Sequence, residues 1–489
     1  MRSADELTIK SGMSGFQLLS AAGARVFEFV KAQFDLDSRI LVACGTGNNG
    51  GDGMIAAQLL LDEGFDVNVA LLGESKDIVG DTRLALDQLT VPLLNVIETD
   101  LSNYTLVIDA LLGTGLNRPI TGELARWITS VNSRALDVVS VDLPTGINGD
   151  SGEIMNVALE AEHTVTFFKP KLGHLLYPGR FHCGNLHTTD IGIVDRVLDS
   201  VQPDVYVNSQ ELWSDSLPAL DWRSNKYTRG HTVVVAGDAD GAARLAARAA
   251  LRTGSGLVTL ACSSRKADVV GGQVTAEMIE IVDSTDQLMN LLADSRITAI
   301  VIGPGMAVGS QTREMVSVVL KGSAPVVLDA GALTSFSAHR DALFEMVSRS
   351  LQAVVLTPHA GEFHRLFSSV TENPLTSKVT LAVKAAHQSG ATVVSKGPDT
   401  VVAEPGGLSC INTNAPPWLA TAGSGDVLAG TIAGWLAQGV DTFLSASMGV
   451  WLQGRAAAEF GPGLIATDIA EQYPQVLQKL RSHPEKSSL

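Results

Sequence analysis

The sequence predicts an α/β protein of two domains, each built on a largely parallel β-sheet between layers of helices. Short runs of apolar and β-branched residues alternate with helical patterns through both halves of the chain, as is typical of parallel sheets covered on both faces. A length of 489 residues is more than one hydrophobic core usually serves. The alternation stops over residues 193–228, a polar stretch with two prolines. We therefore expect one domain at residues 1–207 and a second at residues 208–489.

The first half is expected to begin with a helix at residues 15–33. Its buried strands are expected at the apolar runs 39–44, 65–72, 104–112, 135–144 and 164–168, with helices at 54–63 and 122–132. The second half restarts the alternation, with strands expected at 231–237, 256–262, 297–305, 324–331, 351–359 and 391–397. Alanine-rich helices follow from residue 425 onward.

Composition excludes several classes of function. A formal net charge of −17 argues against a nucleic-acid groove and a polybasic membrane surface, since both need a basic face. The longest uncharged apolar stretch, residues 427–440, is too short to span a bilayer. The four cysteines show no CxxC spacing, which argues against a zinc site and fits a reducing compartment. The first residues lack the apolar run of a signal peptide, so we expect a cytoplasmic enzyme without a membrane anchor or nucleic-acid partner.

The stretch GTGNNGGDG at residues 45–53 follows the first expected strand and contains five glycines. Its backbone amides, with the N-terminus of the following helix, are suited to hold an anion such as phosphate. A tight strand-to-helix turn with asparagines in left-handed conformations is an equally open interpretation. The spacing differs from the GxGxxG dinucleotide fingerprint.

Three further strand ends carry polar residues. Asp109 closes one strand, Asp142 closes the next, and Lys169 and Lys171 follow the run TVTFF. A lone aspartate at a strand end is often only a helix cap. Because the carboxyl ends of parallel strands meet at one edge of the sheet, we expect the two aspartates, each followed by a glycine turn, to converge on one pocket.

The first half resembles the NAD(P)H-hydrate epimerases over roughly residues 1–205. The stretches that carry the resemblance are GNNGGDG, DALLGTGL, VDLPTGINGDSG and HTVTFFKPKLGHLLYPG. It implies a Rossmann-like three-layer sandwich in which Asp142 is the best candidate for catalytic acid or base. It also implies a potassium ion near Asn49, Asp109 and Thr145, where the family commonly has serine in place of Thr145. The implied substrate-binding residues are Asn48, Asn49, Gly50, Gly51, Asp52, Gly113, Thr114, Gly115, Leu116, Asn117, Arg118, Pro119 and Asp142.

The strongest single motif of the second half is TAGSGDVLAGTIAGWLAQG at residues 421–439. Its glycines at the start of a helix expose amides that suit an anion, and Asp426 is placed to accept a proton during phosphoryl transfer. An aspartate that only caps a buried helix is the alternative. The stretches SKGPDT (395–400) and LTPHAGEF (356–363) supply Lys396 and His359 at two other expected strand ends.

The order of these stretches resembles the ADP-dependent NAD(P)H-hydrate dehydratases, which have a ribokinase-like fold, over roughly residues 222–480. The other matched stretches are KYTRGHTVVVAGD, GAARLAARAALRTGSGLVTL, VIGPGM and VVLDAGAL. Many members have aspartate where Gly331 stands and glycine where Ala307 and Ala422 stand. The resemblance implies nucleotide contacts at Lys396, Gly397, Pro398, Asp399, Thr400 and Gly425. It implies contacts to the hydrated dinucleotide at Ala242, Gly305, His359 and Asp426, with Asp426 catalytic.

Together the two halves predict a bifunctional enzyme that repairs damaged nicotinamide nucleotides. The first domain would epimerise R and S hydrates of NADH and NADPH, and the second would dehydrate the S form while ADP yields AMP and phosphate. The implied cofactors are K⁺ and Mg²⁺, with ADP as co-substrate, and we expect a homo-oligomer. The alternative is an ATP-dependent, ribokinase-like small-molecule kinase with a non-catalytic, nucleotide-sensing N-terminal domain. The stretch LTPHAGEF favours the dehydratase.

Overall fold

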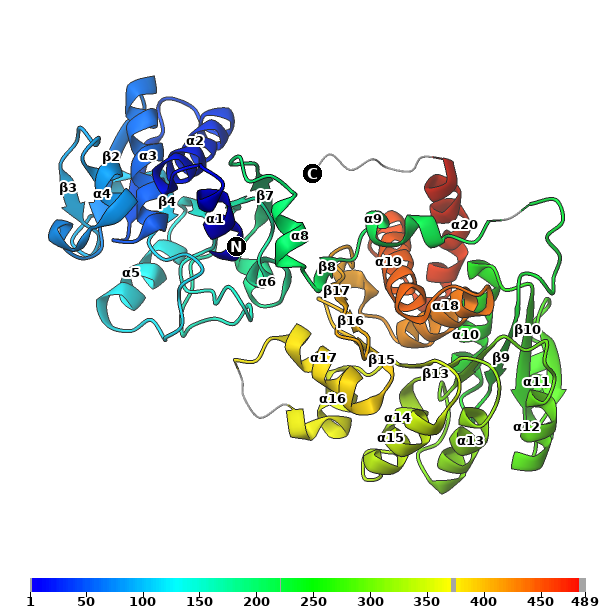
Figure 1. Ribbon diagram of the computed structural model, residues 1–489. Helices are drawn as coiled ribbons and strands as arrows, with labels where there is room; N and C mark the ends of the chain where they lie inside the picture. The colour runs from blue at the N-terminus through cyan, green and yellow to red at the C-terminus, as the bar shows by residue number, and fades with distance from the viewer. Residues whose placement is uncertain (1, 220, 371–374, 483–489) are drawn as a thin grey trace. The chain divides into compact units, whose positions relative to one another are not determined.

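The computed structural model describes residues 2–219, 221–370 and 375–482, and the chain divides into two units between Pro203 and Asp204. Figure 1 colours the first unit from blue to green and the second from green to red. The expected boundary after residue 207 differs from this division by one strand. The strand β8 (Val205–Val207) pairs in parallel with β17 (Ser409–Ile411), so its backbone completes the sheet of the second unit.

Within residues 2–203, seven parallel strands form one sheet in the order β3-β2-β1-β4-β5-β6-β7. The order reverses between β1 and β4, which makes this position the topological switch point of a Rossmann-like sheet. The expected strands are confirmed, and the short β3 and the polar β7 are additions. The strands are β1 (Arg39–Cys44), β2 (Asp66–Leu71), β3 (Leu93–Asn95), β4 (Leu106–Ala110), β5 (Asp137–Val141), β6 (His163–Phe167) and β7 (Asn185–Thr189).

Helices cover both faces of this sheet. Side chains of β1 alternate between two hydrophobic clusters, with Ile40 and Val42 in one and Leu41 and Ala43 in the other, as expected for a strand at the centre of a three-layer sandwich. Ser14 begins α2 with a capping box to Gln17, which fixes the helix start. The helices are α1 (Arg2–Lys10), α2 (Gly15–Gln33), α3 (Asn48–Glu63), α4 (Gly80–Leu86), α5 (Gly122–Asn132), α6 (Leu172–Leu175), α7 (Gly179–His182) and α8 (Val197–Val201).

In the described part of residues 204–482, ten strands form a sheet in the order β11-β10-β9-β12-β13-β14-β15-β16-β17-β8. Neighbours are parallel from β11 to β15, whereas β16 is antiparallel to both of its neighbours. The six expected strands are confirmed as β9 (His231–Val235), β10 (Leu257–Cys262), β12 (Ala299–Ile302), β13 (Val326–Leu328), β14 (Val354–Leu356) and β15 (Thr392–Ser395). The strands β8, β11 (Met278–Ile281), β16 (Val401–Ala403) and β17 are additions.

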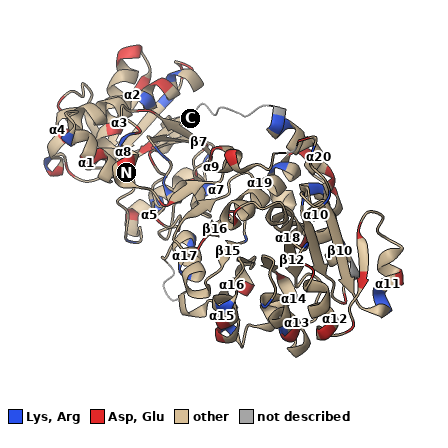
Figure 2. Ribbon diagram, turned by 45° about the vertical axis from the view of Figure 1, so that its right-hand side comes forward, with Lys and Arg blue, Asp and Glu red and all other residues tan. Residues whose placement is uncertain are grey.

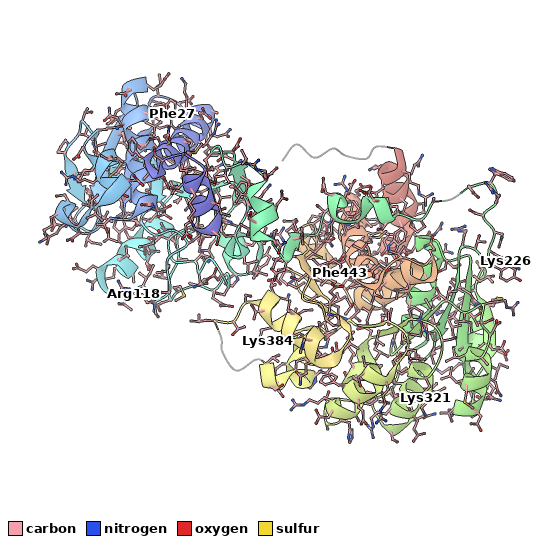
Figure 3. The ribbon with its side chains drawn as sticks, viewed as in Figure 1. Phe27, Arg118, Lys226, Lys321, Lys384 and Phe443 are labelled. Carbon is pink, nitrogen blue, oxygen red and sulfur yellow. The ribbon has the colours of Figure 1, made fainter. Side chains whose placement is uncertain are left out.

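Alanine- and glycine-rich helices pack closely in the second unit. Figure 1 shows α10, α18, α19 and α20 gathered on one face of the sheet and α13, α14 and α15 on the other. A Cβ atom at Gly430 would lie 2.0 Å from the Ala246 carbonyl oxygen, so α18 and α10 touch through their backbones. Phe443, labelled in Figure 3, is 2% exposed in the same core.

The helices of this unit vary from four to nineteen residues in length. All twelve are α9 (Gln210–Trp213), α10 (Asp240–Thr253), α11 (Ser264–Gly271), α12 (Thr285–Leu292), α13 (Ser310–Leu320), α14 (Ala330–Ser335), α15 (Arg340–Arg349), α16 (Ala360–Leu366), α17 (Lys378–Ser389), α18 (Ser424–Ala437), α19 (Thr442–Phe460) and α20 (Ala466–Ser482), counted over the described residues. Figure 2 shows Lys and Arg scattered among Asp and Glu over the surface helices. Among the described helices, none combines the length and the apolar character that crossing a membrane requires.

Candidate active sites

A cavity of about 1010 Å³ opens at the switch point of the first unit. It gathers side chains from the start of α3, from the segment after β4 and from the ends of β5 and β6. This is where an open parallel sheet places a ligand. The expected residues that line it are Asn48, Asn49, Asp52, Gly113, Thr114, Gly115, Leu116, Asn117, Arg118, Pro119 and Asp142.

The glycine-rich stretch is helical, which corrects the expected loop. Helix α3 starts at Asn48 rather than at residue 54, and neither asparagine has a positive φ. A Cβ atom at Gly50 would lie 1.9 Å from the Gly45 carbonyl oxygen, and one at Gly53 would lie 2.5 Å from the Ala110 Cβ. The glycines therefore let the first turns of α3 press against the sheet. Gly50 and Gly51 are buried and do not line the cavity.

Asp109 lies beneath the cavity and is fully buried. Thr145 donates to its carboxylate from Oγ1 at 2.6 Å and from its amide at 2.7 Å, and Ser140 Oγ donates at 2.9 Å. Asp109 makes no ion pair with any residue in the described ranges. Burial raises the pKa of Asp109, and the hydrogen bonds from Thr145 and Ser140 oppose that rise. The carboxylate is thus a buried charge held by neutral donors.

Asn49 projects from the first turn of α3 into the cavity wall. A Cβ atom at Gly113 would lie 3.3 Å from its side-chain oxygen, so the two segments touch here. The Asn49 side-chain nitrogen is buried and has no hydrogen-bond partner among the described residues. A buried polar atom without a partner is costly, and it marks a position where a ligand or ion would complete the site.

Asp142 pairs with Lys171, a partner that the sequence reasoning noted at a strand end but did not assign to the site. Lys171 Nζ lies 2.5 Å from Asp142 Oδ1, 2.7 Å from Thr166 Oγ1 and 3.3 Å from the Phe167 carbonyl oxygen, so its three donors are all used. Both side chains are mostly buried, at 9% and 14% exposed. Lys169 lies elsewhere, where it forms a half-exposed ion pair with Asp195.

The two cavity carboxyls have pKa values that move in opposite directions. Burial raises the pKa of Asp142, but the charge and hydrogen bond of Lys171 outweigh it and hold that pKa below its usual value. Burial, reinforced by the charges of Asp142 and Asp5, raises the pKa of Asp52 well above its usual value. Opposite shifts of this kind separate a base from an acid. Asp5, from α1, is a lining residue that carried no sequence signal.

Arg118 is the exposed cation of this cavity. It lies on the segment between β4 and α5, is labelled in Figure 3, and makes no ion pair within residues 2–203. Lys171 is already committed to Asp142. Arg118 is therefore the lining cation that remains available for an anionic part of a ligand.

In the second unit, two strand-end residues and the start of α18 meet. Asp329 follows β13 and is 1% exposed, and its Oδ1 lies 2.8 Å from Lys396 Nζ, which follows β15. A Cβ atom at Gly425 would lie 3.2 Å from that Nζ. Glycine at position 425 therefore lets the backbone approach the ion pair. The sequence contained Asp329 in the stretch DAGAL, whose match alone is weak.

Asp426 lies in the first turn of α18, after Gly423, which has a φ of +89°. Burial and the charge of Asp329 raise the pKa of Asp426 to about 6, while Lys396 opposes the shift. A carboxylate with such a pKa is suited to take and return a proton near neutral pH.

The predicted phosphate loop, residues 396–400, is braced from two sides. Lys378 of α17, which the sequence reasoning missed, lies 2.6 Å from Asp399 Oδ1. Thr400 Oγ1 accepts from the Gly397 amide at 3.2 Å and donates to the Gly397 carbonyl at 2.8 Å. Asp399 and Thr400 are buried. Their side chains therefore shape the loop, and the partly buried Lys396 directs its ammonium group to Asp329 beside the start of α18.

His359 is the N-cap of α16, where its Nδ1 accepts from the Gly361 amide at 3.0 Å. Its side chain is 57% exposed, and its Nε2 lies 3.5 Å from a carboxylate oxygen of the buried Glu362. Ala242 and Gly305 are neighbours, since a Cβ atom at Gly305 would lie 3.2 Å from the Ala242 Cβ.

At Gly331 a Cβ atom would lie 2.3 Å from the Met306 carbonyl oxygen. This chain thus has no room for the aspartate that many dehydratases carry at that position.

Two family models match the chain. One described as YjeF-related protein N-terminus matches residues 15–173, and one described as NAD(P)H-hydrate dehydratase matches residues 232–475. The bifunctional NAD(P)H-hydrate repair enzyme of Moorella thermoacetica is 33% identical over 500 residues, which cover 96% of this chain and 93% of that one.

Two solved structures resemble the second unit. An ADP/ATP-dependent NAD(P)H-hydrate dehydratase from Bacillus subtilis, co-crystallised with ATP and Mg²⁺, has a TM-score of 0.48 at 29% identity and covers 57% of this chain and 99% of its own. A ribokinase-like superfamily protein from Enterococcus faecalis has a TM-score of 0.50 at 23% identity and covers 57% of this chain and 96% of its own. The latter confirms the ribokinase-like fold predicted for this unit.

Proposed function

Because the chain belongs to the family of bifunctional NAD(P)H-hydrate repair enzymes, we propose that its first unit interconverts the R and S hydrates and its second unit dehydrates the S form. The observation that carries the epimerase part is the single cavity at the switch point, which joins the start of α3 to Asp142 and Lys171. Its volume of about 1010 Å³ is at the upper end of the range for ligand sites, about 300–1000 Å³, and suits a dinucleotide.

The diphosphate of the substrate is assigned to the start of α3. The first amides of a helix have no partner within the helix and carry its positive dipole end. Asn48 and Asn49 face the cavity from this turn. Burial raises the pKa of Asp52, which favours its neutral carboxyl and so weakens its repulsion of the diphosphate. Arg118 supplies a full positive charge on the opposite wall.

Inversion of the hydroxyl-bearing carbon requires that its carbon–oxygen bond break, with water leaving, and form again as water adds to the other face. The leaving hydroxyl takes a proton from a donor, and the adding water gives a proton to an acceptor. Asp142 is ionised, and its Oδ2 has no hydrogen bond from a described residue, so it accepts the proton. Asp52, with its raised pKa, donates it. Lys171 keeps Asp142 charged and aimed, and residues 113–119 cover the ring.

Asn49, Asp109 and Thr145 fit a potassium ion. The three side chains supply amide, carboxylate and hydroxyl oxygens, which hard cations prefer. The buried Asp109 charge has no cationic partner among the described residues, and turning the unpartnered Asn49 amide by 180° would present its oxygen. A bound ion would supply positive charge to this part of the site.

In the second unit, Asp426 takes the proton of the ring hydroxyl as that oxygen accepts the terminal phosphoryl group of ADP. AMP leaves in that transfer; the carbon–oxygen bond then breaks to release phosphate, and the neighbouring ring carbon loses a proton, which restores the double bond of the ring. Lys396 and the amides near Gly425 hold the transferring phosphates, with residues 397–400 as the loop below them. Ala242, Gly305 and His359 border the hydrated dinucleotide. Mg²⁺ neutralises phosphate oxygens in such transfers, and Asp329 is the acidic side chain nearest to Lys396.

The test uses purified protein with R hydrate, S hydrate or their mixture, each with ADP and Mg²⁺, with ATP and Mg²⁺, or without nucleotide. NADH recovery is followed by absorbance and AMP by chromatography. Full recovery from both epimers, with AMP released, supports both activities. Recovery that stops at the S fraction contradicts the epimerase proposal. No recovery with either nucleotide would contradict the dehydratase proposal and favour a small-molecule kinase.

We also propose a cytoplasmic location and a homo-oligomeric state. All four cysteines are buried and free, which suits a reducing compartment. Fractionation of cells that produce the protein tests the first proposal. Size-exclusion chromatography with light scattering tests the second, and a mass near 51.3 kDa would contradict it.

A further inference from the structure

A buried histidine joins the backbone of Asp142 to that of Lys171. His174 lies in the short helix α6 and is 2% exposed. Its Nδ1 accepts a hydrogen bond from the Lys171 amide at 2.9 Å. Its proton is therefore on Nε2, which donates to the Asp142 carbonyl oxygen at 2.6 Å. One imidazole ring thus holds the main chain of both members of the ion pair.

The backbone of Asp142 needs such support. Its φ of +63° lies in the left-handed region, which residues other than glycine rarely adopt and which persists only when surrounding contacts enforce it. The Asp142 amide donates to the Val165 carbonyl oxygen at 2.8 Å, and its carbonyl accepts from His174. Both main-chain polar groups are therefore fixed, and the turn aims the carboxylate into the cavity.

We propose that His174 is a positioning residue for the epimerase reaction. It fixes the main chain of Asp142 and of Lys171, and so sets where the carboxylate and the ammonium group meet the substrate. The inference rests on the proposed function of the first unit. His174 is not among the residues of 2–203 that line the cavity, so it acts through the two residues that it holds.

The protonation state of His174 suits this role. Burial and the nearby Lys171 charge lower the pKa of His174 to about 4, against the opposing effect of Asp142. The ring is therefore neutral at the pH of an ordinary assay. It keeps one donor and one acceptor, which are the groups that the two backbone contacts require.

Three substitutions separate the two contacts. His174→Gln places an amide donor near the position of Nε2 and keeps the contact to Asp142. His174→Asn places an acceptor near the position of Nδ1 and keeps the contact to Lys171. His174→Phe keeps the ring and neither contact. Misplacement of a reacting group by about 1 Å costs on the order of 10²-fold, so we expect His174→Phe to lower epimerase kcat by about that factor.

The readout is the split between kcat and KM, measured from R hydrate to S hydrate by chromatography without nucleotide. KM should stay within about twofold, because the lining residues are unchanged. His174→Gln and His174→Asn should each retain more kcat than His174→Phe. The proposal is overturned if folded Gln and Asn variants keep native kcat, or if the loss falls on KM alone. Absence of epimerisation by the native chain would instead contradict the proposed function.

His182 provides a matched control in the same unit. It is 8% exposed, and its Nδ1 lies 2.9 Å from the Leu159 carbonyl oxygen, away from Asp142 and Lys171. His182→Phe therefore removes a comparable buried contact. We expect it to lower the melting temperature while kcat stays native. If kcat falls equally in His182→Phe and His174→Phe, the loss comes from a general loss of stability and not from positioning. That result would overturn the proposal.

Discussion

Replacement of Lys171 by methionine tests the ion pair at the centre of the first site. Methionine keeps the apolar length of the side chain and removes its charge and three hydrogen bonds. Asp142 would then be a buried carboxylate without a partner, since both members are mostly buried, at 9% and 14% exposed. Breaking a buried pair in this way costs about 3–5 kcal/mol. For a unit of this size each kcal/mol lowers the melting temperature by about 2–4 °C.

The expected result is therefore a fall of roughly 6–20 °C in the transition of the first unit, measured by differential scanning calorimetry of the full chain. Epimerisation should be lost, and ADP-dependent dehydration of S hydrate should remain. The double variant Asp142→Asn with Lys171→Met removes the uncompensated charge and should regain most of the stability. A single variant that melts as the native chain does, or a double variant no more stable than the single one, would refute the reasoning.

The same variant should reverse the pH dependence that Asp142 contributes. In the native chain the pKa of Asp142 is lowered. Its contribution to the free energy of unfolding is therefore present at neutral pH and is lost as the pH falls through that lowered pKa. Without Lys171, burial raises the pKa of Asp142. The cost of burying Asp142 without its partner is then small at low pH, where the carboxyl is neutral, and grows as the pH rises through the raised pKa. The stability gap between native and variant chains should be larger at pH 8 than at pH 5.

Three further predictions concern single groups. Below pH 6, dehydratase kcat/KM should fall as Asp426 becomes protonated, because its pKa is about 6. Asp329→Asn removes a charge that raises this pKa. In the pH–rate profile of that variant, the acidic fall in kcat/KM should therefore begin at a lower pH than in the native chain. The pKa of His174 is about 4, whereas in the unfolded chain it is near 6.5. As the pH falls from 6.5 to 4, the free energy of unfolding should therefore drop by roughly 3 kcal/mol. Urea titrations of His174→Gln over this pH range should lack this drop. Gly50→Ala places a Cβ atom 1.9 Å from the Gly45 carbonyl oxygen, so the first unit should lose its calorimetric transition, whereas Gly47→Ala, with open space around it, should keep it.

The strands could be predicted because their signal is local. Each expected strand is a run of apolar residues, and the burial of both faces follows from the parallel sheet. The strands β7 and β11 were not predicted because they are polar or half-exposed, and β3 was not predicted because it has only three residues. The start of α3 at Asn48 was not predicted because asparagine and glycine are poor helix formers. Close packing of Gly50 and Gly53 against the sheet decides the helix there.

The sequence indicated which strand ends carry polar residues, but it did not indicate how these residues pair. The resemblance to epimerases named Asp142, and the ion pair with Lys171 joins positions 29 residues apart. The pair Asp329–Lys396 spans 67 residues. Contacts of this kind depend on which strand ends the topology brings together. No periodicity or spacing within one segment contains that information.

Both sites combine a lysine with two aspartates, and the placement of the lysine decides their chemistry. In the first unit Lys171 pairs directly with the carboxylate assigned to the reaction, so the pKa of Asp142 is lowered and that group is already a base. In the second unit Lys396 pairs with Asp329, and Asp426 is left beside a like charge with a raised pKa. The base proposed for the epimerase must be ionised when the substrate arrives, which a lowered pKa ensures. The dehydratase base takes a proton from a hydroxyl and must release it before the next turnover, which a pKa near the working pH allows.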